Sequence, residues 1–149
     1  MHGVFYYSTI SGNTALVAEA VQGIFSQAGI TLILQDVAED RTWQDEVDFA
    51  LFGCGTYGHG QLQNTMRQCV ETEWVDRMIK VPCAVIGLGD HRYDREYNMY
   101  AADILENWIR ERSERLLGPA LRINRSPLKL NNQKTIENWA KNFINSLRL

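Results

Sequence analysis

Along this 149-residue chain, short apolar runs typical of strands alternate with stretches whose apolar residues recur at helical spacing. Strands are expected at residues 3–7, 31–34, 49–54 and 81–88, with a fifth at residues 120–123 and 128–130. Helices are expected at residues 13–27, 63–80, 98–117 and 131–147, the last capped by Asn131, and a fifth helix within residues 36–45 is left open. Continuous apolar strands that alternate with helices indicate an α/β fold, a parallel sheet with helices on both faces.

The length and composition indicate one domain over residues 1–149. A hydrophobic content of 45% is ordinary for a globular domain, and no linker, repeat or low-complexity tract interrupts the chain. No apolar run approaches the roughly 18 residues of a membrane span, and no basic segment precedes an apolar one at the start. The cysteines form no C-x-x-C pair and lie in apolar segments, as reduced core thiols do: Cys54, Cys69 and Cys83. We expect a soluble cytoplasmic protein without membrane partners.

The formal net charge of −3 conceals an uneven distribution. Residues 36–76 hold nine acidic and two basic side chains, whereas residues 110–149 hold nine basic and three acidic ones. Most of these bases fall on the solvated faces of expected helices, and no basic stripe is interleaved with aromatic residues. We therefore expect no nucleic-acid binding.

Three loops follow the first, third and fourth expected strands, at the carboxyl edge where parallel α/β sheets bind ligands. The first, residues 9–14 (TISGNT), offers three hydroxyls, a carboxamide, the flexible Gly12 and the amides of a helix N-terminus. These groups suit a phosphate, and the absence of a Gly-Lys-Ser/Thr sequence favours a terminal monophosphate over a triphosphate. A Ser/Thr-rich helix cap that binds nothing remains an open alternative.

The other two loops each carry a tyrosine. Residues 53–58 satisfy G-x-G-x-x-G, but they follow the third strand and not the first, so they do not form a dinucleotide fingerprint. Their glycines allow the backbone to approach a flat ligand, and Tyr57 offers a ring face. The third loop, residues 87–93, places Tyr93 at a neighbouring strand end. Two such tyrosines can enclose a planar heterocycle, although a lone loop aromatic more often only packs.

In order and spacing, these three loops resemble those of the short-chain flavodoxins over essentially the whole chain. Residues 9–14 match the (S/T)-x-(S/T)-G-x-T signature for the FMN phosphate, and residues 87–93 (GLGDHRY) match G-x-G-D-x-x-Y. The resemblance implies a flavodoxin-like three-layer sandwich whose five-stranded parallel sheet has the order 2-1-3-4-5. It also implies FMN as the cofactor.

The resemblance further implies a role for each loop residue. Thr9, Ser11, Asn13 and Thr14 would bind the phosphate through side chains and amides, with Ile10 and Gly12 contributing backbone. Tyr57 and Tyr93 would flank the isoalloxazine, and the Gly58–His59 peptide would flip to accept a hydrogen bond from reduced N5, which stabilises the semiquinone. The remaining cofactor contacts, mainly from the backbone, would come from Gly55, Thr56, Leu88, Gly89, Asp90 and Tyr97.

By the same resemblance the chain is a monomeric electron carrier and not an enzyme, with neither catalytic residues nor a metal. Its donor would be an NAD(P)H-dependent flavodoxin or ferredoxin reductase, or another low-potential donor, and its acceptor an unidentified redox protein. Two other flavoprotein functions stay open: a flavodoxin-like activator of ribonucleotide reductase, and a stand-alone relative of a diflavin reductase FMN domain. An FMN-independent binding module is a more distant alternative.

Two other classes with related architecture lack their key residues here. A receiver domain needs a phosphoacceptor Asp at the end of the third strand, where this chain has Cys54 and Gly55. A low-molecular-weight phosphatase needs an arginine six residues after its cysteine, where this chain has Gly60.

The second loop departs from the family pattern. Flavodoxins often carry Gly-Asp-Gly-Glu-Leu where this chain has His59 and Gln61 within residues 58–62. Removing a negative charge about 8 Å from the flavin is worth about 0.5–1 kcal/mol, or tens of millivolts for one electron. The semiquinone/hydroquinone potential should therefore exceed that of an acidic flavodoxin, and His59 should make it pH-dependent near neutrality. A redox titration without change between pH 6 and 8 would remove the role of His59.

Overall fold

A computed structural model describes residues 1–9, 11–57, 61–89 and 100–149 of the chain. Five parallel strands form its sheet in the order β2-β1-β3-β5-β6. They are β1 (His2–Tyr7), β2 (Thr31–Asp36), β3 (Phe49–Tyr57), β5 (Cys83–Gly89) and β6 (Leu121–Asn124). A short strand, β4 (Gln61–Leu62), pairs antiparallel with the end of β3. Counted along the chain, the parallel strands have the expected order 2-1-3-4-5, so the predicted fold class is confirmed.

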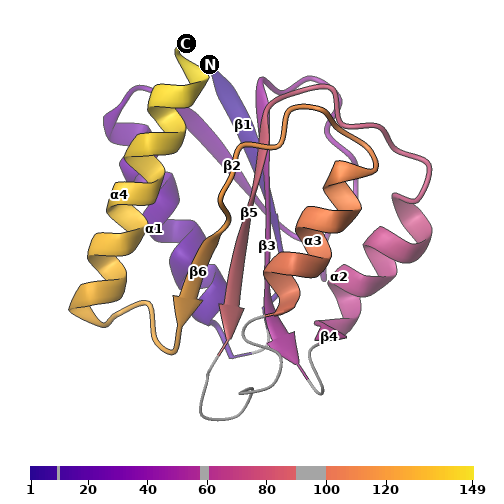
Figure 1. Ribbon diagram of the computed structural model, residues 1–149, viewed down its shortest axis with the longest axis horizontal. Helices are drawn as coiled ribbons and strands as arrows, with labels where there is room; N and C mark the ends of the chain where they lie inside the picture. Colours follow the sequence, from indigo (N-terminus) through magenta and orange to yellow (C-terminus); the bar gives the residue numbers. More distant parts are fainter. Residues whose placement is uncertain (10, 58–60, 90–99) are drawn as a thin grey trace.

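Helices cover both faces of the sheet (Figure 1). Helices α1 (Asn13–Gln27) and α4 (Leu130–Leu147) lie on one face. The other face carries α3 (Tyr100–Arg110) and α2 (Asn64–Gln68), which continues into a π-helical turn, η1 (Cys69–Glu73). None of the described helices combines the length and the apolar character needed to cross a bilayer.

The alternation of side chains along β1 explains why the sheet has a core on each face. Val4 and Tyr6 pack in the core under α2 and α3, whereas Phe5 between them packs in the core under α1 and α4. Because successive side chains of a strand point to opposite faces, a strand buried on both sides must be apolar throughout. This is why β1 reads as a continuous apolar run.

Tyr6 is central to the aromatic cluster under α2 and α3. Its ring centroid lies 4.9 Å from that of Trp74, 5.2 Å from that of Phe52 and 5.5 Å from that of Trp43. Its hydroxyl accepts a hydrogen bond of 2.7 Å from the Gln44 backbone N–H. Burial is the main reason that the pKa of Tyr6 is raised to about 12.

This raised pKa predicts a loss of stability in alkali. The folded pKa lies above the ordinary value of 10.0, so the stabilisation is fully present below pH 10 and is lost as the pH rises toward 12. The loss should amount to about 2–3 kcal/mol. Urea unfolding between pH 8 and 12 measures it, with Tyr6→Phe as the comparison. The variant should be about 1 kcal/mol less stable at pH 7, because Gln44 loses its acceptor, and should decline less above pH 10. Parallel declines would contradict the role of Tyr6.

Residues 36–45, where a fifth helix was left open, contain turns and no helix. The Asp36 carboxylate accepts a hydrogen bond from the Ala38 N–H at 2.9 Å, and the Asp40 carboxylate accepts one from the Thr42 N–H at 3.0 Å. Such Asx turns compete with helical backbone bonds. The Gln35 side-chain amide then donates to the carbonyls of Asp40 and Thr42, which holds the segment against β2.

The expected strand at residues 128–130 and the cap at Asn131 are wrong. Strand β6 ends at Asn124, and Arg125 adopts a φ of 71°. Leu128 and Leu130 are 65% and 81% exposed, and α4 already begins at Leu130. Two surface leucines on either side of a lysine resemble a strand segment when only the sequence is considered.

Two expected helices end at earlier residues than their apolar patterns predict. The helix expected to reach residue 80 ends with η1 at Glu73, where Trp74 enters the core and its indole N–H donates to the Arg41 carbonyl at 3.0 Å. The helix expected to reach residue 117 ends at Arg110. Beyond it, the Cys83 N–H donates to the Arg115 carbonyl, and the Leu117 N–H donates to the Cys83 carbonyl. These residues therefore pair with the start of β5 and cannot continue the helix.

Candidate functional site at the carboxyl edge of the sheet

The carboxyl ends of the parallel strands meet at the lower edge of the molecule in Figure 1. The chain order reverses at β1, which pairs with β2 on one side and with β3 on the other. The Ser8 N–H donates to the Gly53 carbonyl at 3.2 Å, which joins the end of β1 to the middle of β3, where the second predicted loop begins. Such a reversal leaves a crevice outside the strand ends, where α/β proteins bind ligands. The structure thus brings the first and second predicted loops together.

The described part of the first loop, residues 9 and 11–14, bends at residues 11 and 12 and turns into the N-terminus of α1. The Gly12 N–H donates to the Thr9 hydroxyl at 2.9 Å, and the Gly12 carbonyl accepts the first helical bond from Leu16 at 3.0 Å. Gly12 has a φ of 90°, a backbone conformation that residues other than glycine rarely adopt. Among the described residues, a Cβ atom placed there would have no neighbour within 4 Å, so no described side chain fills the space beside Gly12.

This turn has the chemistry of an anion site. The first turn of α1 contains no acidic residue, and Gly12 provides no capping side chain for its amides. Uncapped amides and the positive end of the helix dipole favour a phosphate. Ser11 is exposed and Thr14 is buried, which places hydroxyls at two depths near these amides. Ile10, which was predicted to contribute backbone, lies outside the described residues.

Ser8 is a polar residue at this edge that the sequence analysis did not select. Its side chain is 1% exposed and lies beside the thiol of Cys54. Among the described residues, its hydroxyl has no hydrogen-bond partner of ordinary geometry. A buried hydroxyl normally has a partner, so a further hydrogen bond is expected at this position of the strand end. The signal in the sequence was a polar residue that directly ends an apolar strand.

Cys54 has no chemical role in this site. It is completely buried, and burial raises the pKa of its thiol to about 12. The thiol therefore stays protonated near neutrality and acts as a small core residue, as expected.

The second loop is held by backbone pairing and by one side chain. Gly55 pairs with Leu88 of β5, and Thr56 pairs with Leu62 of β4. The Thr56 hydroxyl accepts a hydrogen bond of 3.0 Å from the Ala101 N–H in the first turn of α3. This hydroxyl therefore caps the N-terminus of α3, although Thr56 is far from α3 in the sequence. It connects the second loop to α3, the helix that follows the third loop. Tyr57 pairs with Gln61 through the backbone, whereas Gly58 and His59 lie outside the described residues.

Removing the Thr56 hydroxyl should loosen this connection. Thr56→Val keeps the shape of the side chain but leaves the Ala101 N–H without its acceptor, at a cost of about 1 kcal/mol in unfolding free energy. Thr56→Ser keeps the acceptor and should cost less. Urea unfolding of the two variants compares them directly. A Thr56→Val protein as stable as the parent, together with a loss in Thr56→Ser, would show that the methyl group, and not the hydrogen bond, stabilises this corner.

The third loop begins at the end of β5. The Leu88 side chain is buried in the core under α1 and α4, so only its backbone faces the edge. The Gly89 carbonyl accepts a hydrogen bond of 2.8 Å from the Arg125 N–H, which holds the end of β5 against the segment after β6. Asp90, Tyr93 and Tyr97 lie outside the described residues. The predicted pair of flanking tyrosines is therefore untested.

Asn132 supports this corner from α4. Its side-chain amide donates to the Asn124 carbonyl at 2.8 Å and to the Ser126 carbonyl at 2.9 Å. The sequence does not reveal this role, because an asparagine next to an expected helix cap looks the same as the cap itself. Within the described residues, no group of three or more His, Cys, Asp or Glu side chains could hold a metal ion.

A flavodoxin family model matches residues 4–139 of this chain. The chain belongs to the flavodoxin family. It is 31% identical over 125 residues to a probable flavodoxin 2 of Bacillus subtilis, covering 81% of this chain and 80% of that one. It is 27% identical over 145 residues to a flavodoxin of Nitratidesulfovibrio vulgaris, covering 95% of both chains.

Solved structures of flavodoxins share this fold. Oxidised flavodoxin 2 of Bacillus cereus superposes with a TM-score of 0.87 at 23% identity, covering 98% of this chain and 99% of that one. Oxidised flavodoxin 1 of the same organism superposes with a TM-score of 0.86 at 19% identity, covering 97% and 98%. The family and the fold support an FMN-binding, electron-transfer role.

Proposed function

We propose that this flavodoxin binds FMN non-covalently and carries single electrons between redox partners. The observation that supports this proposal most strongly is the turn at the N-terminus of α1. There Thr9 positions Gly12, whose free side is filled by no described side chain, and the amides of the first helical turn have neither a capping side chain nor an acidic neighbour in that turn. This donor set is neutral and fits a terminal phosphate. When bound, FMN would supply reversible one-electron chemistry.

The chain itself would bind, orient and shield the cofactor. Hydroxyls and amides of residues 9–14 would hold the phosphate, and the Ser8 hydroxyl is a further donor near the same strand end. The glycines near the ends of β3 and β5 would let backbone groups approach a flat ring system. We propose the following cofactor contacts beyond the phosphate loop: Gly55, Thr56, Tyr57, Gly58, His59, Leu88, Gly89, Asp90, Tyr93 and Tyr97.

The Thr56 hydroxyl oxygen accepts the Ala101 N–H, which fixes its position. Its own O–H is then the donor that the Thr56 side chain could offer to the flavin, beside its backbone groups. We propose an NAD(P)H-dependent flavodoxin or ferredoxin reductase, or another low-potential donor, as the electron source. The acceptor would be a second redox protein, and the carrier would act as a cytoplasmic monomer.

Absorption spectroscopy tests the proposed function. The purified protein should be yellow or become so with added FMN, at one FMN per chain, and stepwise chemical reduction should proceed in two one-electron steps. A protein that takes up no FMN would contradict the proposal. Uptake followed by a single two-electron step would contradict the single-electron role and leave FMN binding in place.

A further inference from the structure

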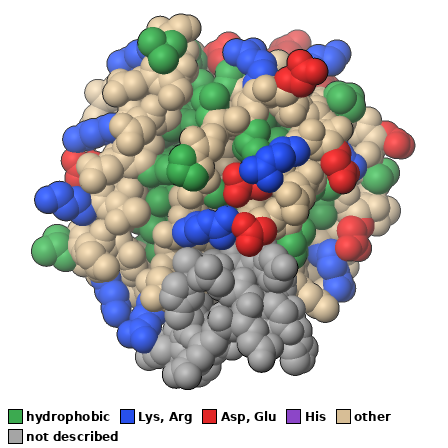
Figure 2. Space-filling model, viewed as in Figure 1, with side chains coloured by type: hydrophobic (Ala, Val, Ile, Leu, Met, Phe, Trp, Pro, Cys, Tyr) green, Lys and Arg blue, Asp and Glu red, His purple; other side chains and the backbone are tan. Residues whose placement is uncertain are grey.

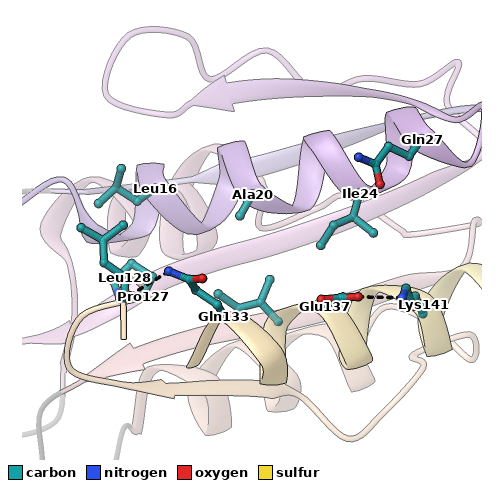
Figure 3. Close-up of a pocket in the computed structure, with 10 residues that line it drawn as sticks. Leu16, Ala20, Ile24, Gln27, Pro127, Leu128, Gln133, Glu137 and Lys141 are labelled. Atoms are coloured by element: carbon teal, nitrogen blue, oxygen red, sulfur yellow. Dashed lines mark hydrogen bonds and ion pairs between the residues drawn. The ribbon is translucent and has the colours of Figure 1, made fainter. Parts of the chain in front are cut away.

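A groove of about 430 Å³ runs between α1 and α4, on the face of the sheet opposite α2 and α3. Its walls are mainly apolar: Leu16, Ala20 and Ile24 come from α1, and Pro127, Leu128 and Ile136 come from α4 and the segment before it. Figure 3 shows Leu16 and Leu128 at the same end of the groove, with Ile24 farther along α1. Leu128 is 65% exposed and Leu16 is 37% exposed. Large apolar side chains so exposed and so close together are typical of an interaction site.

Positive charge borders this groove. Residues 125–148 hold five basic side chains and one acidic one, whereas α1 contributes a single acidic residue, Glu19. The acidic one, Glu137, pairs with Lys141 at 2.7 Å on the groove wall. Lys129 and Lys134 are exposed. Figure 2 shows Lys and Arg side chains along the border of the molecule over α4, at the left of the view. The border is therefore complementary to an acidic surface.

The groove also adjoins the candidate cofactor site. Leu16 follows Thr14 by two residues in the first turns of α1, so this end of the groove opens beside the proposed phosphate loop. We propose that the groove is a docking surface for an acidic redox-partner protein that inserts an apolar side chain between Leu16 and Leu128. Electron transfer after docking rests on the proposed function, but the docking itself does not.

An apolar centre with a charged border is the usual construction of a protein interface. The apolar contact loses water on docking, while the lysines steer an acidic partner and set its orientation. Insertion of a single apolar side chain within a charged border fits the weak, transient encounters of electron carriers. A flat anionic bilayer is a poorer match, because the side chains that line a recess cannot all reach it.

Methyl NMR of the purified protein, labelled at leucine and isoleucine, tests the docking with an acidic two-iron ferredoxin as the probe. Shifts should appear at Leu16, Ile24 and Leu128, and the affinity should fall with increasing salt. Leu128→Gln, and separately Lys129→Gln with Lys134→Gln, should each weaken binding by about tenfold. Met78→Gln and Lys80→Gln are matched controls, because both residues are exposed and lie outside the groove, and they should leave the affinity unchanged.

Several results would overturn the inference. One is a ferredoxin that does not bind, or whose binding shifts only methyl groups outside the groove. Another is a loss of affinity in the control variants as large as in the groove variants, and a third is a basic cytochrome c that binds as tightly as the ferredoxin. Shifts that depend on protein concentration without a probe would assign the groove to a second copy of the chain. Shifts produced by vesicles of anionic lipid would assign it to a membrane. The methyl shifts report docking whether or not an electron is transferred, so docking without electron transfer would contradict the proposed function and leave this inference standing.

Discussion

Riboflavin is expected to bind this flavodoxin about a thousandfold more weakly than FMN. The two ligands differ only in the phosphate, which should meet the amides and hydroxyls at the start of α1. Each hydrogen bond to a charged group is worth about 1.5–3 kcal/mol, so two such bonds give about 3–6 kcal/mol. A difference of about 4 kcal/mol corresponds to a thousandfold in Kd. Fluorescence-quenching titrations of the flavin-free protein with each ligand measure the ratio.

The Ser11→Ala variant tests the contact with the phosphate separately from the contacts with the rest of the ligand. Ser11 is exposed in the turn, and removing its hydroxyl should weaken FMN binding by about tenfold but leave riboflavin binding unchanged. Ser26→Ala is the matched control, because Ser26 is exposed near the opposite end of the same helix. It should change neither affinity. Equal affinities of the unmodified protein for the two flavins would place the phosphate outside this turn.

Gly87→Ala is expected to destabilise the protein by about 2–3 kcal/mol, near the upper end of the cost of overpacking a core. Gly87 lies in β5 directly under α3. A Cβ atom there would stand 2.6 Å from the Cβ of Ala102, 2.9 Å from its N and 3.0 Å from its Cα. Two of these atoms belong to backbone, so the contact can be relieved only by moving the helix. Urea unfolding measures the loss.

Gly23→Ala is the opposite case within the same chain. Gly23 is exposed in the middle of α1, and a Cβ atom there would have no neighbour within 4 Å. The substitution should stabilise the protein by about 0.5–1 kcal/mol, because alanine favours a helix more than glycine does. Combining Gly87→Ala with Ala102→Gly removes the closest contact and should restore part of the stability. A Gly87→Ala protein as stable as the parent would show that α3 moves away at little cost.

Movement of α3 would also reach the candidate site. Ala101, next to Ala102, donates its N–H to the Thr56 hydroxyl at the end of β3. A helix displaced from Gly87 should therefore disturb the second loop, and the FMN affinity should fall together with stability. In this way the packing of one glycine in the core and the position of a binding loop are coupled.

Local sequence patterns were sufficient to predict an element where the residues that determine it lie close together in the sequence. The expected helix at residues 13–27 is observed with the same bounds, because its apolar spacing lies within that segment and Gly12 and Gly29 flank it closely. The strands were recognised as apolar runs because both faces of the sheet are covered. The order of the strands came from the family resemblance and not from any local pattern.

The sequence by itself determined the alternation of strands and helices, the edge that carries the polar loops and the family to which the chain belongs. These features depend on periodicity and on turn residues, which act over a few neighbours. The tertiary structure decided which polar groups are already hydrogen-bonded and which apolar side chains stay exposed. It joined the Thr56 hydroxyl to α3, left the Ser8 hydroxyl without a described partner, and exposed Leu128 beside α1. Each of these outcomes depends on residues far apart in the chain, and only packing brings them within contact distance.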